Sequence, residues 1–440
     1  MATSILALQK PKDISLDEIE AELRNIWRSQ DDGGSAPVAT RATTFTMVIY
    51  EPEEIQQLLA MLSFYKNDID GEHGPATKEA IATAQKAYGL RLTGRVDPET
   101  LAMLRSEASK LSESDRKFDN KDVRGFKFDL AAQNPCRVIT LCPTFGEDEG
   151  VSAQVSAYCP VQKSNSSNLV CCEYITLRGT KEALERVSDL VNSLVVSDLP
   201  KFVWWKGTPN PEQVLFRNIA LASSCLILDS SFYGDAASEM VKIQSLVNEH
   251  TNIADLNWYR LAPWQELAAA AFDPPERRMA LTEVDRVGID YERGNPAQAL
   301  MLLGWLASRL NWQPREAKHE GGDYNIRKVF FTGEGGREIE AELAAIPVLD
   351  WGEVQGDLTG VSLTSTSKEA NCNTILCSEA VGCMRMEAGG SAQSSLVEEV
   401  TSLSDQRSDL LLEQQLQRWG EDVLFEESLA VTSEILRLMA

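Results

Sequence analysis

The residues of this chain best suited to chemistry are three cysteines in the stretch KEANCNTILCSEAVGC, namely Cys372, Cys377 and Cys383. A strand, a turn and a second strand here would bring Cys377 and Cys383 toward the Cα separation of about 5.5–6 Å that a disulfide needs. An exposed, turn-rich setting also favours thiol–disulfide exchange. Two interpretations stay open for this pair, a redox switch or inert thiols, and Cys372 is the weaker third candidate.

The remaining cysteines show no comparable pattern. The chain has nine in all, and an odd number in a long chain argues against a permanent disulfide framework, so we expect most of them to be reduced thiols. We expect the other six to be small buried hydrophobic side chains. They are Cys136, Cys142, Cys159, Cys171, Cys172 and Cys225.

Motifs of the common enzyme classes are missing from the sequence. No G-x-G-x-x-G follows an expected strand, no phosphate-binding loop with its lysine occurs, and no G-x-S-x-G is present. The three histidines lie far apart, without the spacing of a zinc site. We therefore expect no catalytic residue, no cofactor and no metal, and a protein that is not an enzyme. The alternative is a stand-alone sugar-phosphate-binding enzyme or sensor.

Composition restricts the partners. Of 440 residues, 66 are acidic and 42 are basic, which gives a net charge of −24 at pH 7. Nucleic acid and anionic membranes both require a basic surface, so we expect neither as a partner. The first residues lack the features of a secretory signal, and no apolar run reaches the roughly 18 residues of a membrane helix. These features predict a cytoplasmic protein.

Residues 51–110 differ from the rest of the chain and predict three short helices joined by tight turns. The segment resembles the peptidoglycan-binding-like three-helix module, and the resemblance implies that fold. The motif residues mostly shape turns and caps, so we expect a packing or docking module; a peptidoglycan-associated protein is the rival interpretation. The matching residues are Asp70, Gly71, Gly74, Pro75, Thr77, Gln85, Gly89, Leu90, Gly94, Val96, Pro98, Thr100 and Leu101.

Outside this module the first part of the chain has an α/β pattern. Apolar strands are predicted at 134–143, 170–179 and 199–207, and a helix at 180–196 joins the last two. A strand, a helix and a strand in this order predict parallel strands with a right-handed crossover. The strand at 199–207 carries two adjacent tryptophans, which must point to opposite faces and cannot share one environment.

The expected domains follow from these patterns. Residues 1–50 and 120–275 should form a discontinuous α/β domain with a mainly parallel sheet, interrupted by the small all-α module at 51–110. The sequence Asp-Pro-Pro that ends at residue 275 marks a boundary. Beyond it, runs rich in β-branched residues between glycine-rich turns predict an α+β domain with an antiparallel meander over residues 276–440.

A further group of residues is typical of protein interfaces. Trp258, Tyr259, Arg260 and Trp264 combine three aromatic side chains and an arginine next to a proline-bent helix start. Binding hot spots use this mixture of residue types. A single tryptophan is more often a core residue than a contact, so both roles stay open for each, and the group as a whole is our candidate for binding a partner.

Several motifs together resemble the OpcA family of glucose-6-phosphate dehydrogenase assembly proteins. The family pattern has an L-P-x-x-x-W-W strand, a segment D-L-x-W-x-R-L-x-P-W-R-E-L, a strand H-P-S-R-V-I-V-L and a helix G-W-L-A-S-R-L-x-W. Here these motifs appear at residues 200–205, 255–273, 134–141 and 304–312. The inserted module and the extra cysteines resemble the cyanobacterial branch. The departures from the pattern are Asn134 for His, Cys136 for Ser and Gln265 for Arg.

The resemblance implies a non-catalytic protein that binds glucose-6-phosphate dehydrogenase, promotes its active oligomer and raises its activity allosterically, in support of the oxidative pentose phosphate pathway. Such an activator must bind the active state of the dehydrogenase more tightly than the inactive state. The resemblance also implies redox control linked to thioredoxin, which gives Cys377 and Cys383 a role. In that interpretation the oxidised pair holds the meander in its binding form, and reduction loosens it.

Overall fold

The structure is a computed structural model, and it falls into two compact units, residues 1–228 and residues 229–440. Residues 229–275, which the sequence assigned to the α/β domain, lie in the second unit; the domain boundaries drawn from the sequence remain predictions. The described residues are 4–31, 38–41, 43–51, 54–66, 75–94, 98–110, 135–143, 148–161, 168–233, 235–249, 251–273, 275–347, 356–367, 373–379, 383–389, 397–402, 408–418 and 420–439.

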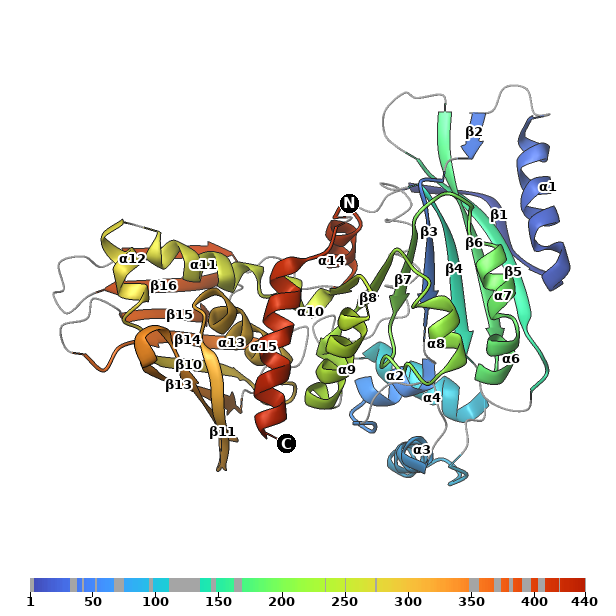
Figure 1. Cartoon of the computed structure of the whole chain (residues 1–440). Coiled ribbons are helices and arrows are strands. Elements are labelled where there is room, and N and C mark those ends of the chain that lie inside the picture. The colour runs from blue at the N-terminus through green and yellow to red at the C-terminus, as the bar shows by residue number, and fades with distance from the viewer. Residues whose placement is uncertain are drawn as a thin grey trace. The chain divides into compact units, whose positions relative to one another are not determined.

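One large sheet forms the first unit (Figure 1). Within this unit the strand order is β1-β5-β6-β4-β3-β7-β8, with β2 beside β6. The strands from β6 to β8 in this order run parallel, whereas β5 is antiparallel to both β1 and β6. The expected mainly parallel sheet is confirmed. The strands are β1 (Ser4–Ile14), β2 (Val38–Arg41), β3 (Phe45–Tyr50), β4 (Cys136–Pro143), β5 (Ser152–Val161), β6 (Asn168–Gly179), β7 (Lys201–Trp205) and β8 (Cys225–Leu228).

Short helices connect these strands, and their ends follow from local sequence. Thr180 is the N-cap of α6, because its hydroxyl accepts a hydrogen bond from the backbone N–H of Ala183 at 3.2 Å. Ahead of α1, Ser15 Oγ donates to Glu18 at 2.6 Å. The elements are η1 (Leu16–Glu18), α1 (Ile19–Asp31), α6 (Lys181–Arg186), α7 (Ser188–Ser193) and α8 (Val214–Ile219).

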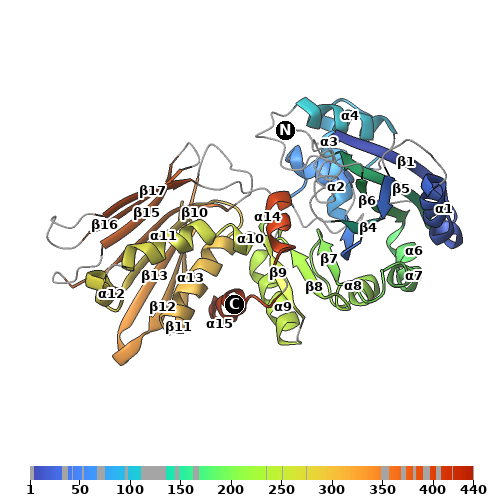
Figure 2. The ribbon, with the colours of Figure 1, turned by 90° about the horizontal axis from the view of Figure 1, so that it is seen from above.

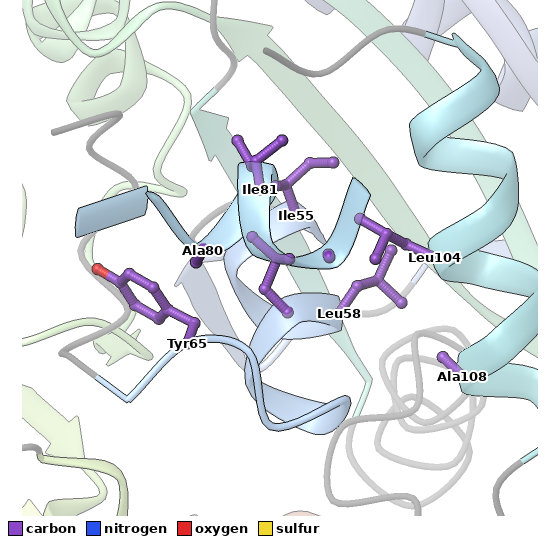
Figure 3. Close-up of a cluster of buried hydrophobic side chains, with 9 residues drawn as sticks. Ile55, Leu58, Tyr65, Ala80, Ile81, Leu104 and Ala108 are labelled. Carbon is purple, nitrogen blue, oxygen red and sulfur yellow. The ribbon is translucent and has the colours of Figure 1, made fainter. Parts of the chain in front are cut away.

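Three helices, α2 (Glu54–Met61), α3 (Pro75–Ala87) and α4 (Pro98–Lys110), lie in the chain between the neighbouring strands β3 and β4. They enclose a small core of buried hydrophobic side chains (Figure 3). Gln85 is fully buried and donates to Thr100 Oγ1 at 3.0 Å, while its carbonyl oxygen accepts from the backbone N–H of Gly94 at 3.0 Å. These motif residues therefore hold the helices and turns together.

A second sheet forms the centre of the second unit, in the order β11-β12-β13-β10-β14-β15-β16-β17. Its pairs are antiparallel except that β10 runs parallel to β13. The expected antiparallel arrangement is confirmed in the main, with β10 inserted at its centre. The strands are β10 (Arg286–Glu292), β11 (Gln313–Gly321), β12 (Ile326–Thr332), β13 (Glu338–Ile346), β14 (Leu358–Thr364), β15 (Asn373–Glu379), β16 (Cys383–Gly389) and β17 (Val397–Ser402).

Helices of the second unit cover one face of this sheet, and Figure 2 shows α11 and α13 lying along it. The remaining elements are η2 (Ser230–Phe232), α9 (Ala236–Asn248), β9 (Ile253–Asp255), α10 (Leu256–Tyr259), α11 (Ala262–Phe272), α12 (Pro275–Leu281), α13 (Ala297–Arg309), η3 (Glu334–Gly336), α14 (Ser408–Gln415) and α15 (Val423–Met439).

Helices α13 and α15 approach each other closely at Gly304. A Cβ atom there would lie 2.2 Å from Thr432 Oγ1 and 2.5 Å from the backbone oxygen of Ser428. Hydroxyl groups of α15 also donate to carbonyl oxygens of α13, with Ser428 bonded to Met301 at 2.7 Å. The glycine of the G-W-L-A-S-R-L motif therefore permits helix contact. In the described part of the chain, no helix has both the length and the hydropathy of a membrane span.

Candidate functional site

The four residues predicted to bind a partner lie on α10, α11 and the turn between them. Trp258, Arg260 and Trp264 are buried, with 4%, 1% and 2% of their surface exposed, whereas Tyr259 is partly exposed. A partner can therefore reach Tyr259 without rearrangement. The other three side chains fix the position of this segment, as their contacts show.

Arg260 forms a buried ion pair with Asp229. Its Nη1 and Nη2 atoms donate to the two carboxylate oxygens at 2.7 and 2.9 Å, and Ser231 and Ser408 donate to the same carboxylate. Burial by itself raises the pKa of Asp229, but the charge and hydrogen bonds of Arg260 outweigh it and hold that pKa below its usual range. Asp229 is therefore a buried carboxylate that depends on Arg260 to stay ionised.

A second set of polar contacts surrounds this pair. Asp255 is the N-cap of α10, and its carboxylate accepts from the backbone N–H groups of Asn257 and Ser230 at 2.9 and 3.0 Å. Burial, with Asp229 nearby, raises the pKa of Asp255 to about 6. The amide of Gln298 on α13 donates to Asn257 at 3.0 Å. The network joins α10 to α13 and gives the segment a fixed geometry.

Trp258 connects α10 to the start of α15. Its indole N–H donates to Asp422 Oδ2 at 3.1 Å, and the other oxygen of Asp422 accepts from the backbone N–H of Phe425 at 3.0 Å. The rings of Trp258 and Phe425 lie 5.8 Å apart. The guanidinium carbon of Arg418 lies 5.1 Å from the centre of the Tyr259 ring. An arginine over an aromatic ring is a favourable cation–π contact.

Exposed apolar side chains occur in the elements that hold this aromatic segment. Val423 and Leu424 directly follow Asp422 and are 57% and 44% exposed, and Leu410 is 36% exposed on α14, which contacts α10. We call Tyr259, Leu410, Arg418, Val423 and Leu424 the Tyr259 surface. Apolar, tyrosine and arginine side chains on a rigid base are features of protein-binding sites.

The candidate redox pair lies on the hairpin of β15 and β16; Cys372 is outside the described residues. Backbone pairing places Cys377 opposite Arg385, and Cys383 opposite Glu379. Cys377 and Cys383 are thus diagonal register neighbours, for which the Cα separation is about 7–8 Å. A disulfide usually needs a Cα separation of about 4.4–6.8 Å, so closing this bond requires a change in the hairpin.

Helix α11 lies between these two features. It contacts β15, β16 and β17 (Figure 2), and it follows α10 after only Arg260 and Leu261. Its buried side chains include Trp264 and Phe272. The hairpin is thus in contact with the helix that directly follows the Tyr259 segment in the chain.

The structure corrects one expectation about the other cysteines. Cys159 on β5 and Cys171 on β6 form a disulfide, with their Cα atoms 4.1 Å apart. Sequence inspection treated both as buried thiols, because their pairing depends on a register that cysteine spacing does not reveal. The antiparallel strands place Tyr158 opposite Cys172, so Cys159 and Cys171 face each other directly. Cys136, Cys172 and Cys225 are buried and outside the disulfide, as expected, whereas Cys142 is only partly buried.

Trp27 of α1 packs over this disulfide together with Leu8. Its indole N–H donates to Glu173 Oε1 at 2.6 Å, and Glu173 pairs with Arg137 at 2.8 Å. Both cysteines are fully buried. Within the ranges that the structure covers, no group of three histidine, cysteine or acidic residues has the arrangement of a metal site.

Comparison with known proteins identifies the class to which these units belong. Residues 128–245 match the N-terminal domain, and residues 251–429 the C-terminal domain, of the glucose-6-phosphate dehydrogenase subunit family. Residues 50–104 match a peptidoglycan binding domain. The chain is therefore a two-domain protein of this subunit class with a helical insertion.

Three curated relatives, all named OpcA and described as OxPP cycle proteins, cover nearly the whole chain. The relative from Synechococcus elongatus is 51% identical over 99% of this chain and 98% of its own length. The relative from Nostoc punctiforme is 52% identical over 99% of this chain and 96% of its own length. The relative from Synechocystis is 49% identical over 99% of this chain and 94% of its own length. The chain belongs to the OpcA family.

Solved structures with a partly similar fold are oxidoreductases. UDP-N-acetylglucosamine 3-dehydrogenase GnnA from Acidithiobacillus ferrooxidans shares 12% identity over 59% of this chain and 86% of its own, with a TM-score of 0.34. KijD10, a 3-ketoreductase from Actinomadura kijaniata, shares 11% identity over 55% and 77%, with a TM-score of 0.36. Similarity at this level carries no argument about activity.

Proposed function

We propose that this chain is a non-catalytic partner of glucose-6-phosphate dehydrogenase that assembles or stabilises the active enzyme and raises its activity, in support of the oxidative pentose phosphate pathway. The observation that supports this most is the match of residues 128–245 and 251–429 to the N-terminal and C-terminal domains of the glucose-6-phosphate dehydrogenase subunit. Thermodynamically, activation requires tighter binding to the active state of the dehydrogenase than to its inactive state.

The direct test is reconstitution with the cognate dehydrogenase. Purified chain is added to the enzyme, complex formation is measured by co-elution, and kcat and KM for glucose 6-phosphate are measured with and without the chain. We expect a complex and a higher kcat/KM. Turnover of a sugar phosphate by the chain alone, without dehydrogenase, would contradict the proposal and support the stand-alone enzyme.

We propose the Tyr259 surface as the place where the dehydrogenase docks. Its support is the combination of partly exposed Tyr259 and exposed Val423 and Leu424 with the partly buried Trp258–Asp422 contact. Leu424→Asp should weaken binding by at least about tenfold, or about 1.4 kcal/mol, because a charge would enter an apolar contact.

The matched control for this variant is Met279→Asp. Met279 is 71% exposed on α12 of the same unit, so this change adds the same charge to an exposed apolar position elsewhere. It should leave binding within about twofold of the wild type. Equal loss of binding in both variants would show a general effect of charge, and no loss in Leu424→Asp would exclude this surface.

We propose further that Cys377 and Cys383 control the activity through thiol–disulfide exchange with a thioredoxin-type dithiol protein. In the oxidising direction, the disulfide form of this protein accepts two electrons and two protons from the pair and becomes a dithiol, while Cys377 and Cys383 form one S–S bond. In the reducing direction, its dithiol form returns them to the pair and becomes a disulfide itself. The diagonal register of Cys377 and Cys383 supports a link between their redox state and the conformation of the hairpin, because the bond forms only if the hairpin shifts against α11.

Redox control is tested by measuring activation of the dehydrogenase under oxidising and reducing conditions. Cys377→Ser and Cys383→Ser should each make activation insensitive to reductant. Cys142→Ser, at a partly buried cysteine of the first unit that lies outside the disulfide, is the control and should retain the wild-type response. An unchanged response in both hairpin variants would exclude this pair as the switch.

A further inference from the structure

The strand order of the first unit reverses between β3 and β7. Along the chain, β4 and β6 are added on one side of β3, whereas β7 and β8 are added on the other side. All five strands are parallel. In parallel α/β sheets such a reversal leaves a crevice at the carboxyl ends of the two strands, and nucleotides bind there. The fold of this unit therefore implies a nucleotide site at the ends of β3 and β7.

Aromatic side chains of the chain itself fill this position. β3 ends at Tyr50 and β7 at Trp205, and the two residues are register partners. Their rings stack with centres 3.8 Å apart and planes 6° from parallel. Phe216 of α8 packs edge-on against the Trp205 ring, with the ring centres 4.9 Å apart. All three are at most 2% exposed, so no room is left for the ring of a base between these strand ends.

The charges beside the stacked rings are also unsuited to a phosphate. Glu51 follows β3 and pairs with Lys206, which follows β7, at 3.7 Å. The lysine Nζ lies 4.3 Å from the centre of the Trp204 ring. The sequence from Glu51 to the start of α2 reads Glu-Pro-Glu-Glu, without glycine. A phosphate site needs free backbone N–H groups and a favourable field, and the carboxylate of Glu51 directly after β3 opposes an anion.

We infer that Tyr50 and Trp205 close the nucleotide position of this sheet, so that the first unit takes no nucleotide there and acts as a scaffold. The residues do not fit the ligand that the strand order implies. The inference concerns a different part of the chain from the Tyr259 surface. Its test contains no dehydrogenase, so its outcome is independent of the proposed activation.

The decisive experiment uses the full wild-type chain with NADP+, NAD+ and ATP. Each is titrated by calorimetry to about 1 mM, where a site with a Kd of 1 mM would be half filled. Amide hydrogen exchange is then measured with and without nucleotide. We expect no protection of residues 47–51 and 203–207. Protection of both segments by any of the three nucleotides would overturn the inference, whereas protection confined to another segment would agree with a closed crevice.

A gain-of-binding experiment tests whether the rings of Tyr50 and Trp205 close the crevice at the ends of β3 and β7. Trp205→Gly removes the indole, and free indole should then raise the Tm of the variant but not of the wild type, because a vacated apolar cavity binds a ligand of its shape. Trp205→Phe is the matched control. The Trp205 indole nitrogen has no hydrogen-bond partner among the described residues, so this change keeps a ring on Tyr50 and deletes no hydrogen bond.

Tyr50→Ala opens the same stack from the other strand and is the second variant if Trp205→Gly does not fold. Stabilisation of the opened variant by indole, with no effect on Trp205→Phe, supports the inference. An equal rise in Tm for the wild type and the opened variant would show that the crevice is already accessible, and would overturn it.

Discussion

Replacement of Arg260 by methionine should strongly destabilise the second unit. The change removes both charge-assisted hydrogen bonds to Asp229, at 2.7 and 2.9 Å, and leaves a carboxylate that is only 5% exposed with its serine contacts alone. Removing one partner of a buried ion pair costs about 3–5 kcal/mol. Because the pair positions α10, the same change should also weaken binding at the Tyr259 surface.

The loss of stability caused by Arg260→Met should become smaller as pH falls. In the wild type the pKa of Asp229 lies below its usual value, so the pair's stabilisation is present above the pKa of the unfolded carboxyl, about 3.9, and is lost as pH falls through the folded pKa. Without Arg260, burial dominates and raises that pKa above the usual value. The carboxyl then gains a proton as pH falls, and the difference between variant and wild type should shrink.

Urea unfolding at pH 5 and pH 8 measures this difference. Asp255 has a pKa of about 6 and titrates in the same range, so the comparison is repeated with Asp255→Asn in both proteins. Arg309→Met is the control, because the Arg309–Glu427 pair is exposed and should contribute less than about 1 kcal/mol. A loss below about 1 kcal/mol for Arg260→Met, or a loss independent of pH, would refute the reasoning.

Four further predictions concern other parts of the chain. Removing the disulfide with Cys159→Ala and Cys171→Ala should lower the free energy of unfolding by about 3 kcal/mol, because a cross-link between residues 12 apart in sequence restricts the unfolded chain; an unchanged urea midpoint would contradict this. Trp27→Ala uncovers the same bond and should speed its reduction by dithiothreitol at least about tenfold, measured by alkylation and mass spectrometry, with an equal rate arguing against the covering role. Gly304→Ala should cost about 1–3 kcal/mol in thermal unfolding, since the added carbon overlaps α15, and a neutral result would mean that the helices separate freely. Gln85→Leu should accelerate amide exchange in α3 and α4 by removing buried hydrogen bonds worth about 1–3 kcal/mol, and unaltered exchange would count against this network.

Local signals in the sequence were sufficient for much of the fold. The apolar runs around β4 and β7, and the threonine before α6, predict elements that the structure contains. β1 was not anticipated, because Pro11 and its charged neighbours interrupt the strand pattern. The position of β10 was also missed, since its partners β13 and β14 come later in the chain.

The candidate site was less predictable, because its residue types suit two environments. Trp258 and Arg260 have the composition of a binding hot spot, yet their partners Asp422 and Asp229 bury them. Neither aspartate is close in sequence to its partner, so no local pattern indicates the pairing. The exposed Leu424 was missed because an apolar residue in a helical pattern reads as core.

Strand β10 has a consequence for folding of the chain during synthesis. It is made before both of its neighbours, β13 and β14. During synthesis, both edges of this central strand therefore stay unpaired until β13 and β14 have been made. Such edges invite pairing with other chains. The exposed residues Arg286 and Asp290 lie among its buried apolar residues, and charges within an apolar strand act as gatekeepers against aggregation. We therefore expect the charges on this strand to protect the newly made chain until the later strands cover its edges.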